Sequence, residues 1–495
     1  MEEKKASSDN FKEGLKGTTL LGGVQVYKIG ISVLRSKALA IFLGPAGVGI
    51  LGLLSSTIEF IYGLTNLGLG TSAIRDISKA NTEGDIKKLS FVSYVFKKLV
   101  WITGLSGAAI CLFLSPIWSR ISFHNGEYTF TIMMLSVAVL SMLLSEGQNS
   151  LLQGTHNMRL MAKSNVWGNT LGLITTLPLY YFFGIKAIGF AIVLSYLFNL
   201  LASWYYSHKI ELIKVRVSFN QALQEGKGMI KLGVLIALSG MLTTAVSYIV
   251  RVFVSNKGGL SDVGLYTAGF AVVSTYVGMI FTGMGSEYFP RLASYSNKKE
   301  EFIRAINEQM QISILLIAPL ICSFIIFSRI GILILYSRDF LGIEQMIYLA
   351  ILAILFKAPS WCCSYAILSK GDSKVFFWTE LAFLLVMLIT NILLYSLFGL
   401  SGLGIAYIIQ YIYYLLQEFV VCKKKYDLAI NRDVYITYIP HVILCLCCLL
   451  TVVFLNNNVR YVVGMIFIIC DATISYKLLS KKVDIKGFMQ SKIKR

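Results

Sequence analysis

The chain reads LITTLPLYYFFGIKAIGFAIVLSYLFNLL at residues 173–201 and LITNILLYSLFGLSGLGIAYIIQYIYYLL at residues 388–416. The two stretches align without a gap, and Thr175, Tyr180 and Tyr196 are among the matched positions. An earlier block recurs at the same offset: Val48, Gly49, Gly63, Gly68 and Gly70 return as Val263, Gly264, Gly278, Gly283 and Gly285. One offset shared by two separate blocks indicates an internal duplication, which is typical of membrane transporters.

The composition predicts an all-α polytopic membrane protein. Of the 495 residues, 56% are hydrophobic and 14% are charged, with a mean hydropathy of +0.69. This apolar content is more than a soluble fold of this length needs for its core. Between about residues 16 and 478 we find fourteen apolar segments of the roughly 20 residues that cross ~30 Å of hydrocarbon. The loops between them are too short for a soluble domain.

The positive charge follows the topology of a membrane protein and does not indicate a nucleic-acid partner. The net charge is +19, but Lys and Arg alternate from loop to loop. They fill the N-terminus, the second, sixth, eighth and twelfth loops and the tail from Lys477, whereas each odd-numbered loop holds at most two. By the positive-inside rule both termini are cytoplasmic, which requires an even number of spans.

The duplication predicts the domain organisation. Six segments lie in an N-terminal lobe, residues 1–215, and six in a C-terminal lobe, residues 216–430. An even number per copy makes the repeats parallel, with a cleft between the two lobes. Residues 431–495 hold the two extra helices and a basic cytoplasmic tail.

The first segment carries the clearest candidate site. Gln25, Lys28, Ser32 and Arg35 follow a spacing of 3, 4 and 3 residues, which places all four on one helical face. Such a cationic stripe suits an anionic ligand, because the guanidinium fork matches phosphate oxygens. The structural alternative is that Arg35 snorkels to the outer head groups while Lys28 pairs with Glu59. Lys37 points away from Lys28 and is expected to snorkel.

Other ionisable residues within the segments are candidates for ion coupling or for lining a cavity: Glu59, Glu146, Lys357 and Glu380. Glu59 is either the counter-charge of Lys28 or a carboxylate that couples transport to an ion gradient. Lys357 and Glu380 either form a salt bridge or line one cavity. Glu308 and Asp471 are expected to reach the cytoplasmic surface.

The charges do not repeat with the scaffold. In the register of the duplication, Lys28 and Arg35 correspond to Thr243 and Val250, and Arg251 is the nearest equivalent of Arg35. We therefore expect the anionic part of a ligand on the first lobe, with Arg251 as a further binding residue.

The sequence does not favour an enzyme, and no cofactor is expected. The four histidines are scattered, and no nucleophile or metal-ligand spacing is present. Cys445, Cys447 and Cys448 have only His441 nearby, so a metal site is not predicted. The charged residues 370–374 are expected to form a tight cytoplasmic turn.

Several motifs resemble those of the O-antigen flippases of the Wzx type and the enterobacterial common antigen flippase. They are KALAIFLGPAGVG at residues 37–49, DVGLY at 262–266, YFPRL at 288–292, and Gln153-Gly154 with Met158 and Asn165. The likeness covers most of the first twelve segments. Similar motifs recur in the wider superfamily, which includes multidrug antiporters and lipid II flippases. Fourteen segments are found in lipid II flippases, whereas twelve are usual in O-antigen flippases.

This resemblance implies a V-shaped, two-lobed protein of the bacterial inner membrane that works by alternating access. It would move an undecaprenyl-pyrophosphate-linked oligosaccharide to the periplasmic leaflet, with H⁺ or Na⁺ as candidate coupling ions. Its partners would be the lipid-linked substrate, membrane lipids, a polysaccharide polymerase and chain-length machinery. The alternative within the superfamily is a cation-coupled multidrug antiporter, for which carboxylates would be expected in place of Lys28 and Arg35.

Overall fold

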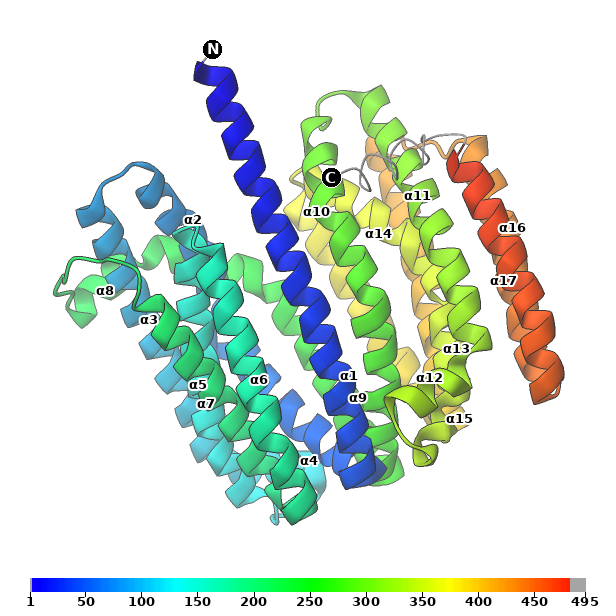
Figure 1. Ribbon diagram of the computed structural model, residues 1–495, viewed down its shortest axis with the longest axis horizontal. Coiled ribbons are helices and arrows are strands. Elements are labelled where there is room, and N and C mark those ends of the chain that lie inside the picture. Colours follow the sequence, from blue (N-terminus) through cyan, green and yellow to red (C-terminus); the bar gives the residue numbers. More distant parts are fainter. Residues whose placement is uncertain (1, 481–495) are drawn as a thin grey trace. The chain divides into compact units, whose positions relative to one another are not determined.

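The computed structural model describes the backbone of residues 2–480 and, with a few exceptions, the side chains from Tyr27 onward. All regular elements within this range are helices, which confirms the all-α prediction (Figure 1). Residue contacts divide the chain into two units: unit 1 extends to Gly264 and unit 2 begins at Leu265.

Unit 1 contains α1 (Glu2–Thr65), α2 (Leu69–Thr82), α3 (Ile86–Phe113), α4 (Ser115–Phe123), α5 (Thr129–Gly154), α6 (Met158–Phe183), η1 (Gly184–Ala187), α7 (Ile188–Ser207), α8 (Phe219–Glu225) and most of α9 (Lys227–Ala271). Unit 2 contains η2 (Val272–Val277), α10 (Gly278–Ser294), α11 (Lys299–Ile326), α12 (Ser328–Leu335), η3 (Arg338–Ile343), α13 (Glu344–Leu352), α14 (Ile354–Ser369), α15 (Ser373–Tyr426), α16 (Arg432–Phe454) and α17 (Asn457–Ser480).

Nine helices in the described residues are long and apolar enough to cross a membrane, or ten when the bent pair Arg338–Leu352 and Ile354–Ser369 counts as one span. Four of the nine contain 39 to 58 residues: Tyr27–Thr65, Met158–Ser207, Ala237–Ser294 and Ser373–Tyr426. At 1.5 Å per residue they run for about 58 to 87 Å, at least roughly twice the ~30 Å hydrocarbon core. If each supplies two spans, the segments agree in number with the fourteen predicted.

The breaks in these long helices repeat with the duplication. Gly44 in α1 and Gly259 in α9 have φ of 62° and 80°, and Gly184 after α6 and Gly399 in α15 have φ of 55° and 60°. The two members of each pair occupy equivalent positions in the two copies. Positive φ is readily adopted by glycine alone, so these positions let a helix break off and resume in a new direction. The duplication thus fixes where the chain turns.

Two further repeated glycines allow backbones to touch. A Cβ on Gly49 would lie 1.9 Å from the carbonyl oxygen of Leu260, and a Cβ on Gly264 would lie 1.8 Å from that of Pro45. Pro45 and Leu260 are themselves equivalent positions of the two copies. The two contacts are therefore reciprocal in the register of the duplication.

The first part of α9 packs on α1, which is why contacts assign it to unit 1. The ring of Tyr248 stacks on Phe60 with centroids 5.2 Å apart, and Arg251 Nη1 donates to Ser56 Oγ at 2.7 Å. The contact boundary at Gly264 therefore lies farther along the chain than the end of the first copy. The predicted lobes, 1–215 and 216–430, are defined by the duplication and stay a prediction.

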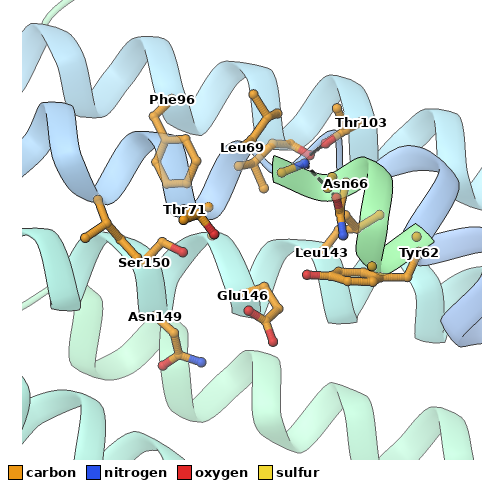
Figure 2. A pocket seen from close by; sticks show the side chains of 18 of the residues that line it. Tyr62, Asn66, Leu69, Thr71, Phe96, Thr103, Leu143, Glu146, Asn149 and Ser150 are labelled. Atoms are coloured by element: carbon orange, nitrogen blue, oxygen red, sulfur yellow. Dashed lines mark hydrogen bonds between the residues drawn. The ribbon is translucent and has the colours of Figure 1, made fainter. Parts of the chain in front are cut away.

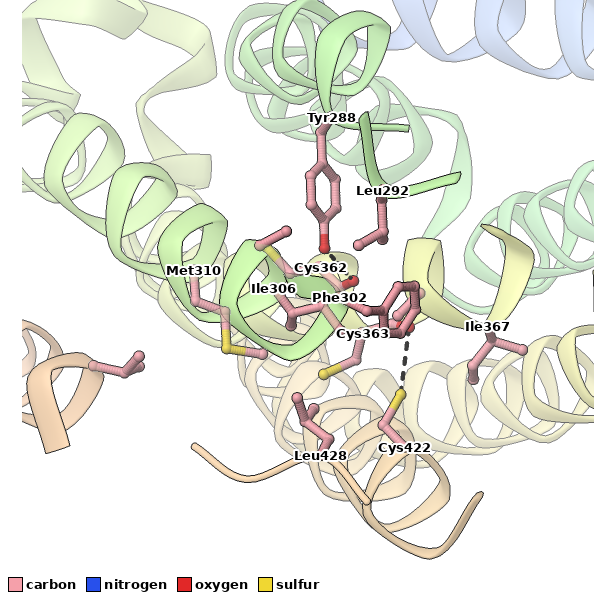
Figure 3. Close-up of a cluster of buried hydrophobic side chains, with 13 residues drawn as sticks. Tyr288, Leu292, Phe302, Ile306, Met310, Cys362, Cys363, Ile367, Cys422 and Leu428 are labelled. Carbon is pink, nitrogen blue, oxygen red and sulfur yellow. Dashed lines mark hydrogen bonds between the residues drawn. The ribbon is translucent and has the colours of Figure 1, made fainter. Parts of the chain in front are cut away.

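Unit 2 is centred on α11, which contacts α14, α16 and α17. One core cluster gathers Tyr288, Phe302, Cys362, Cys363 and Cys422, and the Tyr288 hydroxyl donates to the Cys362 carbonyl at 3.1 Å (Figure 3). The aromatic and thiol side chains interdigitate where α10, α11, α14 and α15 meet. This packing holds the helices that carry Lys357 and Glu380.

The two C-terminal helices are joined by buried polar contacts. His441 Nδ1 lies 2.5 Å from Asp471 Oδ1, and both side chains are fully buried. The expectation that Asp471 reaches the cytoplasmic surface is therefore wrong, because α16 supplies a partner inside the bundle. Arg460 of α17 contacts Glu344 at 2.8 Å and donates to the Ile326 carbonyl. Glu308, by contrast, is half-exposed and lies near Arg291 and Arg304.

Residues 370–374 form the expected tight turn, and Asp372 provides a prediction about pH. The Tyr426 hydroxyl donates to its carboxylate and Lys425 lies nearby, so the pKa of Asp372 is lowered below the usual 3.8. A carboxyl group whose pKa is lower in the folded than in the unfolded state stabilises the fold at pH values above its unfolded pKa. This contribution is lost as the pH falls through the folded pKa.

We expect Asp372→Asn to lower the free energy of unfolding at pH 7 by less than about 1 kcal/mol, because the carboxylate is partly exposed. Thermal unfolding in detergent should show this difference at neutral pH and lose it below pH 3.8. A difference that persists unchanged in acid would contradict the role assigned to the carboxylate.

Candidate substrate-binding site

The cationic stripe predicted in the first segment lies on α1. Lys28, Ser32 and Arg35 are half-buried, and each is separated from the next by about one helical turn. The side chain of Gln25 lies outside the described residues. The stripe thus presents two cations about two turns apart inside an apolar helix.

The guanidinium of Arg35 is held against α6 and α7. Its Nη2 would lie 3.7 Å from a Cβ on Gly172, and the group interacts electrostatically with the phenols of Tyr180 and Tyr196. Its Nε and Nη2 atoms are buried and have no hydrogen-bond partner in the described residues. A buried donor without an acceptor costs roughly 1–3 kcal/mol. Whether Arg35 binds an anion stays a prediction.

Lys28 and Glu59 each have a different counter-charge from the one considered in the sequence. Lys28 interacts electrostatically with Glu146 of α5. The ion-pair partner of Glu59 is Arg251, at 4.0 Å. The spacing along α1 could not reveal either pairing, because α5 and α9 supply the partners.

Arg251 is largely engaged within the protein. Its side chain is only 14% exposed, it donates to Ser56 and it lies near the half-exposed Glu59. These contacts fasten α9 to α1 beside the cationic stripe. Its proposed contact with substrate stays a prediction.

A cavity of about 420 Å³ adjoins Glu146 in unit 1. Figure 2 shows the Glu146 carboxylate between the side chains of Tyr62 and Asn149, which also line the cavity. The rest of the polar lining is neutral: Asn66, Thr71, Thr103, Ser150, Gln153 and Thr244. This size falls within the range of small-molecule sites, and amides with hydroxyls can both donate to and accept from a polyhydroxylated ligand. We name it the amide cavity.

Glu146 was predicted as a residue that could line a cavity, but the sequence missed the neutral lining of the amide cavity, because uncharged polar residues in apolar segments carry little signal on their own. One signal was available. Gly68 and Gly70, two of the repeated glycines, line the cavity; Gly68 lies in the break between α1 and α2, and Gly70 lies in the first turn of α2. These glycines indicate a position where regular helix packing is interrupted.

Unit 2 contains a second cavity, of about 340 Å³, which both Lys357 and Glu380 line. Lys357 lies over the rings of Phe281 and Tyr411, and the Tyr414 hydroxyl donates to Glu380. Of the two alternatives left open by the sequence, the shared cavity agrees with this arrangement.

A family model described as polysaccharide biosynthesis protein matches residues 38–345. The chain belongs to this family. Stage V sporulation protein B of Bacillus subtilis (strain 168) is 24% identical to it over 223 residues, which are 43% of the chain and 42% of that protein. The chain therefore spans less than half the length of this curated relative.

A comparison with solved structures identifies the fold of this protein. A multidrug resistance transporter of the MATE family, in the MOP superfamily, aligns with a TM-score of 0.68 at 14% identity, over 80% of this chain and 94% of that one. The lipid II flippase MurJ, in an inward closed conformation, aligns with a TM-score of 0.64 at 13% identity, over 94% and 99%. These identities establish the fold alone.

The polysaccharide biosynthesis family member is thus a multi-pass membrane protein with the fold of the MOP superfamily transporters. The fold expected from the resemblance is therefore confirmed. The two solved structures that share this fold are a multidrug transporter and a lipid II flippase, and the alignment with the flippase extends over more of the chain than the alignment with the transporter.

Proposed function

We propose that this protein is a flippase that moves an undecaprenyl-pyrophosphate-linked oligosaccharide across the bacterial inner membrane by alternating access. The cargo would be a repeat unit of O-antigen or a related surface polysaccharide. The observation that carries the proposal is the guanidinium of Arg35, which is buried with two nitrogens that lack a partner in the described residues. The family match supports the polysaccharide class of the cargo.

The cations of unit 1 and the lining of the amide cavity would bind different parts of the cargo. Arg35 and Lys28 would bind the pyrophosphate, for which charge-assisted and bidentate hydrogen bonds are the strongest available. The amide cavity would receive the sugar next to it, because its neutral polar lining suits hydroxyl groups. Arg251 would position this surface through Ser56 and Glu59.

Ion coupling belongs to the same proposal. Glu59 and Glu146 both lie beside cations of unit 1, so protonation or Na⁺ binding at either would change the charge that the pyrophosphate meets. In unit 2, Glu380 and Lys357 are the corresponding candidates. A polymerase and chain-length machinery would take the exported repeat unit in the periplasm.

The second candidate is a cation-coupled multidrug antiporter, which the fold of the MATE transporter supports. For an organic cation to bind, the negative charge of Glu146 would have to outweigh the positive charges near it. The presence of Lys28 beside Glu146 and of Arg35 on the same helix favours an anionic substrate instead.

The proposal is tested by depleting the protein in cells that make the surface polysaccharide. We expect lipid-linked repeat units to accumulate in the inner membrane, where a glycan-specific probe added to the periplasm cannot reach them. Restoring expression should restore access. Repeat units that remain accessible throughout depletion would exclude the flippase function.

We expect the Glu146 carboxylate to compete with the pyrophosphate of the ligand for Lys28. In Glu146→Gln the lysine loses an internal counter-charge, so we expect undecaprenyl pyrophosphate to bind up to about fivefold more tightly, in line with the ~0.2–1 kcal/mol of a partly exposed charge pair. Thermophoresis with the solubilised protein measures the affinity. Glu127→Gln, in the exposed turn before α5, is the matched control. Weaker binding by Glu146→Gln would show that Glu146 does not compete with the ligand.

A further inference from the structure

The cavity of unit 2 has walls unlike those of the amide cavity. Beside Lys357 and Glu380, it is lined by six aromatic side chains: Trp361, Tyr365, Phe376, Phe383, Tyr411 and Tyr414. They come from α14 and from both halves of α15. We name this the aromatic cavity. At about 340 Å³ it is near the lower limit for small-molecule sites, so its ligand is small.

Lys357 is positioned to meet an anion there. Its ammonium lies 5.3 Å from the ring centroids of both Phe281 and Tyr411, where cation–π attraction stabilises the charge. In the described part of the chain no carboxylate lies within ion-pair distance of it. A lysine inside a membrane segment costs about 2.5–3.5 kcal/mol by insertion scales and marks a functional site by default. Its donors are thus available to a ligand.

Lys357 in unit 2 occupies a position similar to that of Arg35 in unit 1. Tyr411 is the repeat equivalent of Tyr196, and Tyr196 interacts electrostatically with Arg35. Each repeat therefore places a cation beside the same tyrosine, although the cation comes from α1 in unit 1 and from α14 in unit 2. The sequence comparison at one offset could not detect this equivalence, because Lys357 corresponds to Met142.

Glu380 limits what kind of anion fits. Its carboxylate lines the same cavity and accepts a hydrogen bond from Tyr414. A pyrophosphate, with several negative charges, would be repelled by it. A ring that carries one carboxylate and several hydroxyls can pair with Lys357, donate hydroxyl hydrogen bonds to Glu380 and stack its apolar C–H face on an aromatic wall.

We propose that the aromatic cavity is a glycan site for an acidic pyranose, a sugar ring that bears a carboxylate. The inference rests on the proposed export of a lipid-linked oligosaccharide and adds to it the class of sugar that the cargo contains. The proposed pyrophosphate site on unit 1 and the proposed sugar site on unit 2 thus each have a cation of their own.

Saturation-transfer NMR on the full-length protein in nanodiscs tests the site, with methyl glucuronide and methyl glucoside as probes. We expect the glucuronide to bind about tenfold more tightly, the effect of one charge-assisted hydrogen bond. Lys357→Met should remove the preference while retaining the apolar stem, and Trp361→Leu should weaken both probes. Lys370→Met, a lysine over aromatic rings outside the cavity, is the matched control.

Three results would overturn the proposal: equal binding of both glycosides, no saturation transfer to either, or binding of tetraphenylphosphonium that is stronger than that of the glucuronide and depends on Glu380. Failure of the proposed function is a separate result. It would appear as wild-type protein that binds the glucuronide but does not move undecaprenyl-pyrophosphate-linked saccharide across a bilayer.

Discussion

Replacing Arg35 by alanine is expected to reduce export of the lipid-linked glycan by at least about tenfold, since a hydrogen bond to a charged group contributes roughly 1.5–3 kcal/mol. Two buried nitrogens of the guanidinium, Nε and Nη2, have no hydrogen-bond partner in the described residues, so the variant removes donors for which the described part of the fold supplies no acceptor. Lys28→Ala should have a smaller effect, because Lys28 already interacts with Glu146. Export is measured as periplasmic exposure of the repeat unit at matched protein levels.

Two further variants, Arg35→Lys and Lys37→Ala, test whether the shape and the position of the Arg35 side chain matter as well as its charge. Arg35→Lys keeps the charge but loses the planar fork, so we expect partial recovery only. Lys37→Ala removes a cation from the same helix but from a different face, and should leave export near the wild-type level. Full export in both Arg35→Ala and Lys28→Ala would mean that the stripe is structural.

The second large effect is expected at the reciprocal glycine contact. A methyl group on Gly49 or Gly264 would meet a backbone carbonyl at 1.9 or 1.8 Å, so the two helices must separate. Overpacking of this kind costs about 1–3 kcal/mol per site. We expect Gly49→Ala and Gly264→Ala each to lower the thermal midpoint in detergent, and Gly49→Ala/Gly264→Ala to cost less than the sum, because one separation relieves both clashes.

Gly30→Ala is the matched control for this series. A Cβ at Gly30, also in α1, meets nothing within 4 Å, and alanine is favoured over glycine in a helix. Its thermal midpoint should stay the same or rise. Unchanged midpoints for the two contact variants would show that the helices do not approach as closely as the structure indicates.

The features of the fold that repeat were predictable from the sequence. Gly184 and Gly399 are matched in the blocks that revealed the duplication, and both prove to be helix breaks with positive φ. Gly44 and Gly259 belong to the same pattern. Such positions could be anticipated because a special backbone conformation requires one residue type, and this requirement is retained in both copies.

The partners of the charged residues were not predictable, because they depend on which helices touch. Residue spacing placed Lys28 and Arg35 on one face of α1, yet it could not show that α5 supplies Glu146 or that α9 supplies Arg251. Asp471 in the last predicted segment was expected at the cytoplasmic surface, whereas α16 buries it against His441. The amide cavity was missed for a related reason, since neutral amides and hydroxyls acquire meaning only when several helices bring them together.

We propose that this protein carries a pyrophosphate-linked saccharide on the cations of unit 1. The most direct measurement uses proteoliposomes that contain the purified protein and an undecaprenyl-pyrophosphate-linked saccharide, with an enzyme or lectin outside that detects only the outer leaflet. We predict that wild type moves saccharide from the inner to the outer leaflet and that Arg35→Ala does so at least about tenfold more slowly. Equal rates for wild type, Arg35→Ala and protein-free liposomes would contradict the claim.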